Sequence, residues 1–414
     1  MLSSLSREAC DSLDQRDALA SLRSAFRLPP GLIYLDGNSL GPLTNEAAQR
    51  VTAALDREWG LDLVASWNSH GWMDAPDRIG ARIARLVGAS PEAVVVADST
   101  TVNIFKLVVA WMHGSGSRCR IVTELGNFPT DLYVLQGVAE LLGPAVELQA
   151  VARKDVLDAM DSSTSLLVLT HVHYKTAEMY DLDAVTALAH ARGAAVLWDL
   201  SHSVGAVPVD LQRARADLAV GCTYKFLNGG PGAPAFLYVR PDLTERVGPG
   251  IAGWLGHEAP FDFIDEYRAA AGVRRHRVGT PGILSLSALD GSLSAFDDVD
   301  MAALRTKSVA LTDMFIELVE SRCNSHGLTL ITPRAPQCRG SHVSFAHPRA
   351  YSIVQALAAR GVVGDFRAPD IMRFGIAPLY TRFVDIWDAA ERLHAVLQTQ
   401  AWQEPQFNER KAVT

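Results

Sequence analysis

Two stretches of sequence decide the fold: AAVLWDLSHSVGA at residues 194–206 and DLAVGCTYKFLN at residues 217–228. Each contains a short run rich in alanine, valine and leucine, the pattern of a strand that is buried on both faces of a parallel sheet. Polar residues follow each run: Asp199 ends the first, His202 comes three residues later, and Lys225 lies just beyond the second. Because open α/β sheets bind ligands at the carboxyl ends of their strands, these side chains predict a ligand site.

An aspartate and a lysine at two strand ends favour the chemistry of pyridoxal 5'-phosphate (PLP). A lysine amine forms a Schiff base with the PLP aldehyde, and a carboxylate beside the pyridine nitrogen keeps that nitrogen protonated, so that the ring accepts electrons. Lys225 would be the first group and Asp199 the second. The alternative is an ordinary surface ion pair, and these two residues alone do not separate the two interpretations.

The composition is that of a globular enzyme without a nucleic-acid or membrane partner. The chain has 414 residues, of which 48% are hydrophobic and 20% charged, and its net charge is −8 at pH 7. This charge argues against a nucleic-acid surface, and no apolar run approaches the roughly 18 residues of a membrane span. The polar N-terminal residues do not read as a secretory signal. The five cysteines have no metal-site or redox spacing, which predicts reduced thiols in a cytoplasmic protein.

A phosphate site is predicted where the strand AVVVA (93–97) meets a helix. The turn between them contains Ser99, Thr100 and Thr101. The first N–H groups of a helix lack partners within it and favour an anion, and threonine hydroxyls add further donors. The alternative is that Ser99 or Thr100 is only the N-cap of the helix.

The segment IVTELGNFPTDLYVL (121–135) repeats the strand–loop–helix pattern. Phe128 would project from the loop, where its ring can stack on a planar cofactor, and Asp131 is equally well explained as a first-turn acid. The next strand, LLVLT (166–170), is followed by His171 and His173, a spacing that indicates zinc only weakly. No third ligand is near, and no metal site is predicted.

The alternation of buried strands and helices between about 90 and 240 predicts an α/β fold with a mostly parallel sheet covered on both faces. A smaller α+β region is predicted after it, with strands near 328–332, 341–346 and 362–366 and helices at 350–360 and 383–399. The expected organisation is an N-terminal segment associated with the small domain, a large cofactor-binding domain and a small C-terminal domain, at residues 1–45, 46–290 and 291–414.

Two other residues are candidates for substrate contact. His70 lies in a loop with two tryptophans, SWNSHGWMDAP (66–76), which can pack an aromatic substrate, although tryptophan pairs are more often core or interface residues. Arg373 lies on the predicted strand in IMRFGIAPLY (371–380). A strand arginine is either an edge residue or a bidentate clamp for a carboxylate.

Together these segments resemble the kynureninase family, PLP enzymes of the aspartate-aminotransferase fold (fold type I). The motifs that carry the resemblance span residues 34–380 in the order of the family: YLDGNSLGPL (34–43), STTVN (99–103), NFPTD (127–131), LWDLSHSVGAVPVDL (197–211), CTYKFLNGGPGAPAFLYV (222–239), GWLGH (253–257) and MRFGIAPLY (372–380).

The resemblance implies a role for each candidate residue. Lys225 would form the internal aldimine, Asp199 would pair with the pyridine nitrogen, and Phe128 would stack on the ring. The resemblance implies further cofactor contacts by Thr100, Thr101, Asp131, Thr170, His202 and Tyr224. Trp254 and Thr280 match residues that reach the site from the second subunit of a homodimer, and Arg373 matches the clamp for the substrate α-carboxylate.

The family reaction is hydrolysis of L-kynurenine to anthranilate and L-alanine through a PLP aldimine and cleavage of the Cβ–Cγ bond. Tyr224, next to Lys225, is the candidate general acid–base. Many family members have asparagine where this chain has Thr280, near the substrate ring, so the expectation leans to kynurenine over 3-hydroxykynurenine. The alternative to this reaction is that of another fold type I enzyme, either a cysteine-desulfurase-like lyase or an aminotransferase. The sequence also leaves open whether the reaction serves tryptophan catabolism or NAD synthesis.

Overall fold

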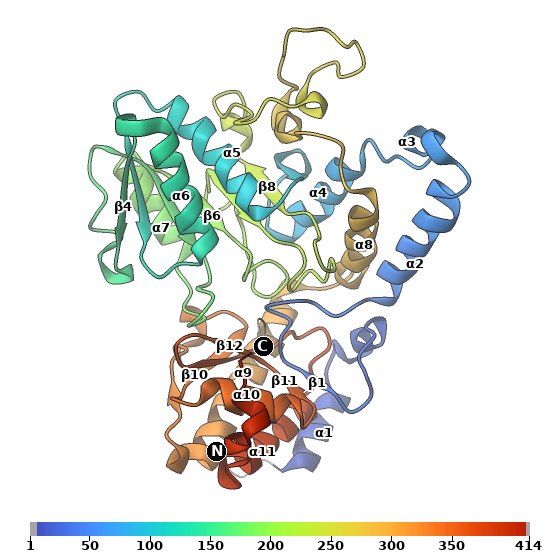
Figure 1. Cartoon of the computed structure of the whole chain (residues 1–414), viewed down its shortest axis with the longest axis vertical. Helices are drawn as coiled ribbons and strands as arrows, with labels where there is room; N and C mark the ends of the chain where they lie inside the picture. The colour runs from blue at the N-terminus through green and yellow to red at the C-terminus, as the bar shows by residue number, and fades with distance from the viewer. Residues whose placement is uncertain (1–5, 411–414) are drawn as a thin grey trace.

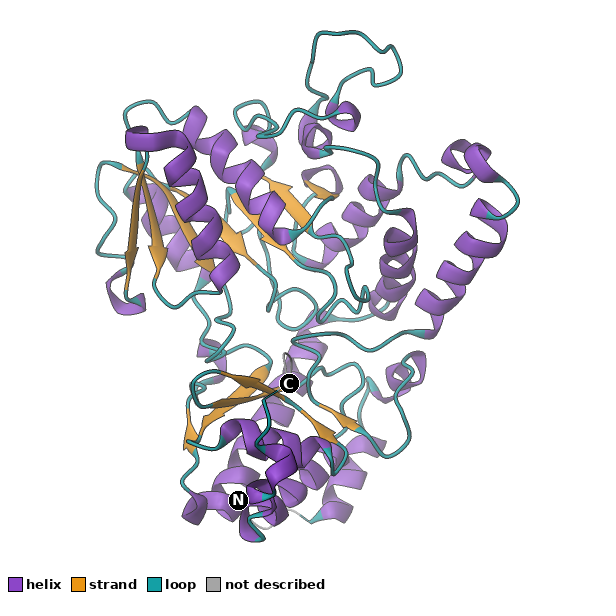
Figure 2. Cartoon of the chain, viewed as in Figure 1, coloured by secondary structure: helices purple, strands orange, loops and turns teal. Residues whose placement is uncertain are grey.

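The computed structural model describes residues 6–410, which form a large sheet with helices on both faces and a smaller sheet region (Figure 1). The large sheet lies in the upper half of Figure 2 and the small one in the lower half. Helices α1 (Arg7–Gln15) and α11 (Phe383–Gln398), from the two ends of the described chain, both lie in the lower half (Figure 1). None of the described helices is long and apolar enough to cross a membrane.

The large sheet has seven strands in the order β2-β8-β7-β6-β5-β3-β4. Their bounds are β2 (Val94–Val96), β3 (Arg120–Glu124), β4 (Glu147–Val151), β5 (Thr164–Thr170), β6 (Ala195–Asp199), β7 (Leu218–Gly221) and β8 (Phe236–Val239). Neighbouring strands are parallel except at β8, which is antiparallel to both β2 and β7. The prediction of a mostly parallel sheet in an α/β fold is therefore confirmed.

Alternating side chains of each strand enter two different cores. In β5, Leu167 and Leu169 join one hydrophobic cluster, whereas Leu166 and Val168 join another. Successive side chains of a strand point to opposite faces, so the two clusters cover the two faces of the sheet. The first cluster includes residues of α4 (Ala75–Leu86), α7 (Leu182–Ala191) and α8 (Ile283–Leu293), and the second includes residues of α5 (Thr100–His113) and α6 (Pro129–Leu142).

The smaller region contains a four-stranded antiparallel sheet in the order β12-β13-β10-β9. Its strands are β9 (Thr329–Leu330), β10 (His342–Ala346), β12 (Asp365–Arg367) and β13 (Ile371–Gly375), and its helices are α9 (Met301–Cys323), α10 (Ala350–Ala358) and α11 (Phe383–Gln398). One hydrophobic cluster joins these helices and strands. The α+β character predicted for this part of the chain is confirmed.

The N-terminal residues fold onto this smaller region. Strand β1 (Ile33–Tyr34) pairs in parallel with β11 (Val362–Val363), and α1 (Arg7–Gln15) packs against α11. The Asp14 carboxylate accepts hydrogen bonds from the first two N–H groups of α11, at 2.7 and 3.0 Å. These N–H groups have no partner within the helix, so Asp14 fixes the start of α11.

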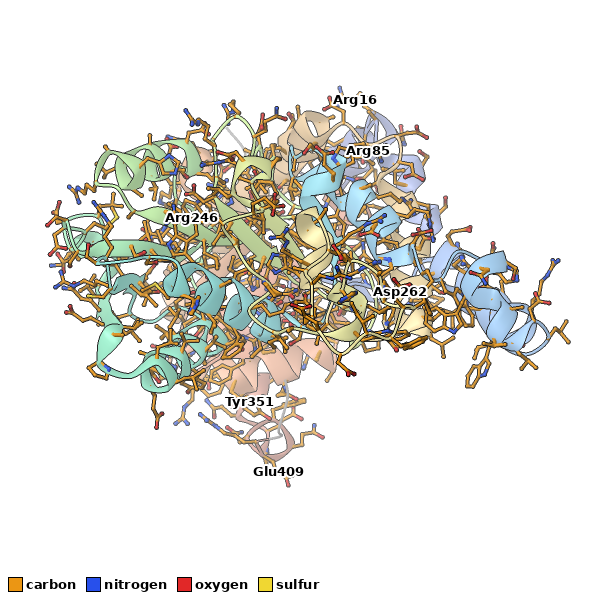
Figure 3. All side chains as sticks on the ribbon, turned by 90° about the horizontal axis from the view of Figure 1, so that it is seen from above. Arg16, Arg85, Arg246, Asp262, Tyr351 and Glu409 are labelled. Atoms are coloured by element: carbon orange, nitrogen blue, oxygen red, sulfur yellow. The ribbon has the colours of Figure 1, made fainter. Side chains whose placement is uncertain are left out.

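Three details differ from the sequence-based expectation. Apolar residues that recur four apart between Thr44 and Trp59 predict one helix there. The structure has α2 (Asn45–Ala53) followed by a π-helical turn at 54–59, and then a short helix, α3 (Ser66–Ser69). This arm projects from the side of the molecule (Figures 1 and 3).

Strand β4 was not predicted because its half-exposed side chains at the sheet edge lack a continuous apolar run. The apolar run at 233–239 predicts a strand from Ala233, whereas strand β8 begins at Phe236.

Candidate functional site

The carboxyl ends of three neighbouring parallel strands meet at one cavity. Thr170 ends β5, Asp199 ends β6, and Lys225 follows β7 by four residues. The amino end of α5 and the loop before α6 complete the walls. The lining residues are Ser99, Thr100, Thr101, Phe128, Thr130, Asp131, Thr170, Tyr174, Asp199, Ser201, His202, Tyr224 and Lys225. The structure thus brings nine of the predicted site residues together.

Lys225 and His202 both line this cavity and form a polar contact with each other. The Lys225 ammonium donates to Nε2 of His202 at 2.9 Å, and Lys225 is 9% exposed. Burial is the main cause that lowers the pKa of His202 well below its ordinary value, and the charge of Lys225 lowers it further. The imidazole is therefore neutral and accepts this hydrogen bond.

Two buried carboxyl groups, those of Asp199 and Asp131, also line the cavity. Burial raises the pKa of Asp199, while the positive charge of Lys225 lowers it. Burial raises the pKa of Asp131 well above its ordinary value, and the charge of Asp199 adds to this rise. Two close carboxylates in a dry site do not both ionise easily. We therefore assign the negative charge to Asp199 and the proton to Asp131.

Asp131 is held by a small hydrogen-bond network. Its Oδ2 accepts from the Thr170 hydroxyl at 3.0 Å and from the amide of Asn127 at 2.9 Å. Asn127 Oδ1 in turn accepts from Thr170 at 2.6 Å and from the backbone N–H of Phe128 at 2.7 Å. Asn127 was not among the predicted site residues. Its position directly before Phe128, in the loop that follows a strand end, is the signal that could have identified it.

The turn before α5 has hydroxyl and backbone N–H donors of the kind that suit an anion. Ser99 is the N-cap, since its hydroxyl accepts from the N–H of Val102 at 3.3 Å, and Thr100 and Thr101 begin the helix beside the cavity. The cap and the phosphate interpretations of this turn are therefore compatible. Beneath it, the buried Lys106 ammonium donates to Asp98 and to the carbonyl of His276, each at 2.7 Å, which anchors the turn.

The cavity fits PLP in the chemistry of its donors and in its aromatic wall. The helix amino end and two hydroxyls suit a phosphate, and the ionised, buried Asp199 suits a pyridinium. Phe128 offers a ring whose centroid lies 5.8 Å from Lys225 Nζ, and Tyr174 supports that ring edge-to-face at 5.2 Å. These residues would hold a planar, anionic cofactor within reach of the lysine amine.

Tyr224 separates this cavity from a larger one of about 630 Å³. Ser99 and Tyr224 line both, and Thr280 lines the larger one. Burial raises the pKa of the Tyr224 phenol, so Tyr224 is neutral at physiological pH and can donate a proton.

Four predicted site residues lie outside the Lys225 cavity of the same chain: Thr280, which lines the larger cavity, and Trp254, His70 and Arg373. Trp254 is 44% exposed, begins a short 3-10 helix (Trp254–Gly256) and packs against Phe261. His70 binds Asp62 at 2.7 Å and lines a separate small hollow. Arg373 is buried behind the cavity, where it donates to the carbonyl of Tyr174 at 2.5 Å.

Comparison with known proteins decides the family. The chain is 49% identical over 413 residues to a kynureninase of Pseudomonas fluorescens, and the match covers 99% of both chains. The chain belongs to the kynureninase family. The family description "Kynureninase C-terminal domain" matches residues 304–393.

Solved structures similar to this kynureninase-family chain show the same fold at low identity. The apo structure of a cysteine desulfurase from Thermococcus onnurineus NA1 has a TM-score of 0.77 at 16% identity, covering 92% of this chain and 98% of that one. A mutant of the protein C-DES, with glycine covalently linked to the PLP cofactor, has a TM-score of 0.75 at 17% identity, covering 88% and 97%. This likeness establishes fold type I but not the reaction.

The chemistry of the cysteines also separates this kynureninase-family chain from a desulfurase. Cys222 lies close enough to Lys225 for the lysine charge to affect its pKa, but burial raises that pKa. A desulfurase requires an accessible, reactive thiolate. Cys222 is a buried neutral thiol that donates to the carbonyl of Ser201, so the desulfurase alternative is not favoured.

Proposed function

We propose that this chain hydrolyses L-kynurenine to anthranilate and L-alanine with PLP bound at Lys225. The observation that carries the proposal is the joint placement of Lys225, Asp199 and the amino end of α5 around one cavity in a member of the kynureninase family. The Cβ–Cγ bond of the substrate breaks, and one water molecule is consumed. The hydroxyl group of the water becomes part of the carboxylate of anthranilate, and its proton is transferred to Cβ of alanine.

Several residues would hold the cofactor. Thr100, Thr101 and the α5 amino end would bind its phosphate, Phe128 would stack on its ring, and Asp199 would pair with the ring nitrogen. Asp131, Thr170 and His202 would make the remaining polar contacts, and Trp254 and Thr280 would come from the second subunit. When bound, PLP supplies an electron sink that stabilises negative charge at the substrate Cα.

The proton transfers fall to Lys225 and Tyr224. The free Lys225 amine would take the proton from Cα, and the neutral His202 would accept a hydrogen bond from it and orient it, as at 2.9 Å here. Because burial raises the pKa of Tyr224, its phenol would act as the acid that protonates the leaving carbon. Arg373 would bind the α-carboxylate, and His70 is a proposed substrate contact.

The substrate ring would occupy the larger cavity, beside Thr280. Threonine is shorter than the asparagine common at this position in the family and offers a shorter partner to a ring hydroxyl. We therefore propose that kynurenine is preferred over 3-hydroxykynurenine, which a competition assay between the two substrates would measure.

We also propose a homodimer with the active site at the subunit interface. Exposed apolar residues in the arm after α2, such as Trp59 and Val64, and in the Trp254 loop, such as Phe263, supply contact area.

The free thiols of all five cysteines support a reducing, cytoplasmic location. The pairing of β1 with β11 supports an N-terminal segment (1–45) joined to the small domain (291–414), with the large domain at 46–290.

The test is anthranilate fluorescence after L-kynurenine is added to the PLP-loaded protein. The wild type is expected to release anthranilate, and Tyr224→Phe to retain the cofactor absorbance but lose about 10²–10⁴-fold in kcat, the contribution typical of a general acid. Cofactor absorbance without anthranilate from the wild type would refute the substrate. Unchanged turnover in Tyr224→Phe would refute the role of the phenol.

A further inference from the structure

The proposed carboxylate clamp, Arg373, belongs to a buried cluster of charges. Asp365 lies opposite Arg373 in the β12–β13 register and accepts from its Nε at 2.9 Å and its Nη2 at 2.5 Å. The same Asp365 carboxylate accepts from Arg367 Nη2 at 2.7 Å and from the Ser39 hydroxyl at 2.5 Å. Asp365 and Arg373 side chains are 2% and 1% exposed, so Asp365 fixes the relative position of the two arginines.

Arg373 has few hydrogen-bond donors left for a substrate. Of the five N–H groups of a guanidinium, two bind Asp365, one binds Ser39 and one binds the carbonyl of Tyr174. One N–H remains without a partner among the described residues. A bidentate grip on a carboxylate needs two donors, so Arg373 in this arrangement cannot supply both.

Arg367 has the donors that Arg373 lacks. Its Nη2 binds Asp365 and Ser39, and its Nη1 donates to the carbonyl of Phe366. Its Nε and the second N–H of Nη1 have no partner among the described residues. The side chain is 31% exposed, and its charge lowers the pKa values of Tyr224 and His202, which places it in electrostatic reach of the cavity.

The charge balance of the cluster favours one bound anion. Burial, and next the charge of Asp365, raise the pKa of Asp36 to about 8, so Asp36 is mostly protonated at neutral pH. Two guanidinium groups then face one carboxylate. The cluster carries one uncompensated positive charge in a poorly solvated place, which a monoanionic carboxylate would neutralise.

We infer that Arg367 is a second residue that binds the substrate α-carboxylate, held beside Arg373 by the carboxylate that they share, Asp365. This inference rests on the proposed function. The substrate carboxylate would lie between the free N–H of Arg373 and the free donors of Arg367. The buried Arg373 and the more accessible Arg367 would each donate hydrogen bonds to it.

The test compares two small ligands of the PLP-loaded enzyme: L-alanine, which has the carboxylate, and L-alaninamide, which lacks it. Dissociation constants are read from the change in visible absorbance of the cofactor. In Arg367→Gln, the constant for L-alanine is expected to rise about tenfold to a hundredfold, the range for a charge-assisted hydrogen bond, with less than about a twofold change for L-alaninamide. Arg367→Lys is expected to recover part of the loss, and KM for L-kynurenine to rise more than kcat falls.

A matched control is Arg360→Gln, which removes an exposed arginine after α10. It is expected to leave both dissociation constants unchanged. If Arg367→Gln weakens both ligands equally, or neither, the inference is wrong although the proposed function stands. If the wild type releases no anthranilate from L-kynurenine, the proposed function itself fails, whatever the alanine titrations show.

Discussion

At the scale of single residues, the site depends on which of two carboxyl groups carries the charge. Asp131 and Asp199 are both buried, and the pKa of Asp131 is raised by burial and by the charge of Asp199. A protonated aspartic acid has nearly the shape and the charge of asparagine. The two residues should therefore respond differently to the same substitution.

We predict that Asp131→Asn loses less than about tenfold in kcat/KM at pH 7, whereas Asp199→Asn loses about a hundredfold or more, the scale of a lost electrostatic partner. The asparagine oxygen can still accept from Thr170 and Asn127. Steady-state anthranilate release measures both variants, and cofactor absorbance confirms loading. Equal losses would show that Asp131 is ionised in the working enzyme.

The sequence predicted the residues at strand ends but not the charge cluster behind them. Thr170, Asp199 and Lys225 are predictable because parallel strands bring their carboxyl ends to one edge. Asp365 and Ser39 meet across 326 residues of sequence, and no local pattern marks either as a partner of Arg373. Only the register of β12 with β13 places Asp365 opposite Arg373.

At the scale of elements, α2 packs directly on α8. A Cβ added to Gly291 of α8 would lie 2.7 Å from the backbone of Ala47, so the two helices touch at this glycine. Gly137, within α6, has no such neighbour within 4 Å. The two positions form a matched pair for substitution by alanine.

We predict that Gly291→Ala destabilises the protein by about 1–3 kcal/mol through overpacking, whereas Gly137→Ala stabilises it by about 0.5–1 kcal/mol because alanine favours the helix. Chemical denaturation with far-UV circular dichroism measures both changes. A stabilising Gly291→Ala would mean that α2 can move away from α8 without cost.

Element types were predicted well where the apolar pattern was strong and poorly elsewhere. The buried β5 and β6 follow from unbroken apolar runs, and α10 and α11 from helical spacing. The antiparallel direction of β8 was not predictable, because a fully buried strand has the same composition in either direction. The π-helical turn at 54–59 was missed because its residues continue the helical spacing of α2.

At the scale of the whole molecule, buried histidines should make stability depend on pH. Burial lowers the pKa of His171 and His173 to about 4 and that of His276 to about 3, below the ordinary value of about 6.5 in an unfolded chain. The unfolded chain therefore binds more protons than the folded one in this range. The contribution of these histidines to the free energy of unfolding is complete above about pH 6.5 and is lost as the pH falls toward 4.

We predict that these histidines lower the free energy of unfolding between pH 6.5 and 4, and that His276→Phe reduces their combined slope by about 1.4 kcal/mol per pH unit, the contribution of one proton. Denaturant titrations at several pH values measure the slope. An unchanged slope would show that His276 is already protonated in the folded chain. Replacement of the exposed His113 is the control and should have no effect.

The proposed dimer leads to a prediction about mixed subunits. Lys225→Ala and Trp254→Ala should each be nearly inactive alone, because each removes a part of every site. Co-expressed, half of the dimers would be mixed, and each would contain one site with a native Lys225 and a native Trp254 from the other subunit. About a quarter of the wild-type activity should return. No recovery in mixed dimers isolated by two affinity tags would place Trp254 outside the partner's site.

The N-terminal segment also sets an order of events during protein synthesis. The partners of β1 and α1 are β11 and α11, which are translated near the end of the chain. Until they leave the ribosome, the segment has no surface to fold on, although the seven-stranded sheet can already form. Gly41, which donates to the carbonyl of Tyr224 at 2.8 Å, therefore reaches the lysine loop last. A nascent chain that stalls before residue 362 would have a complete sheet and an unfinished catalytic centre.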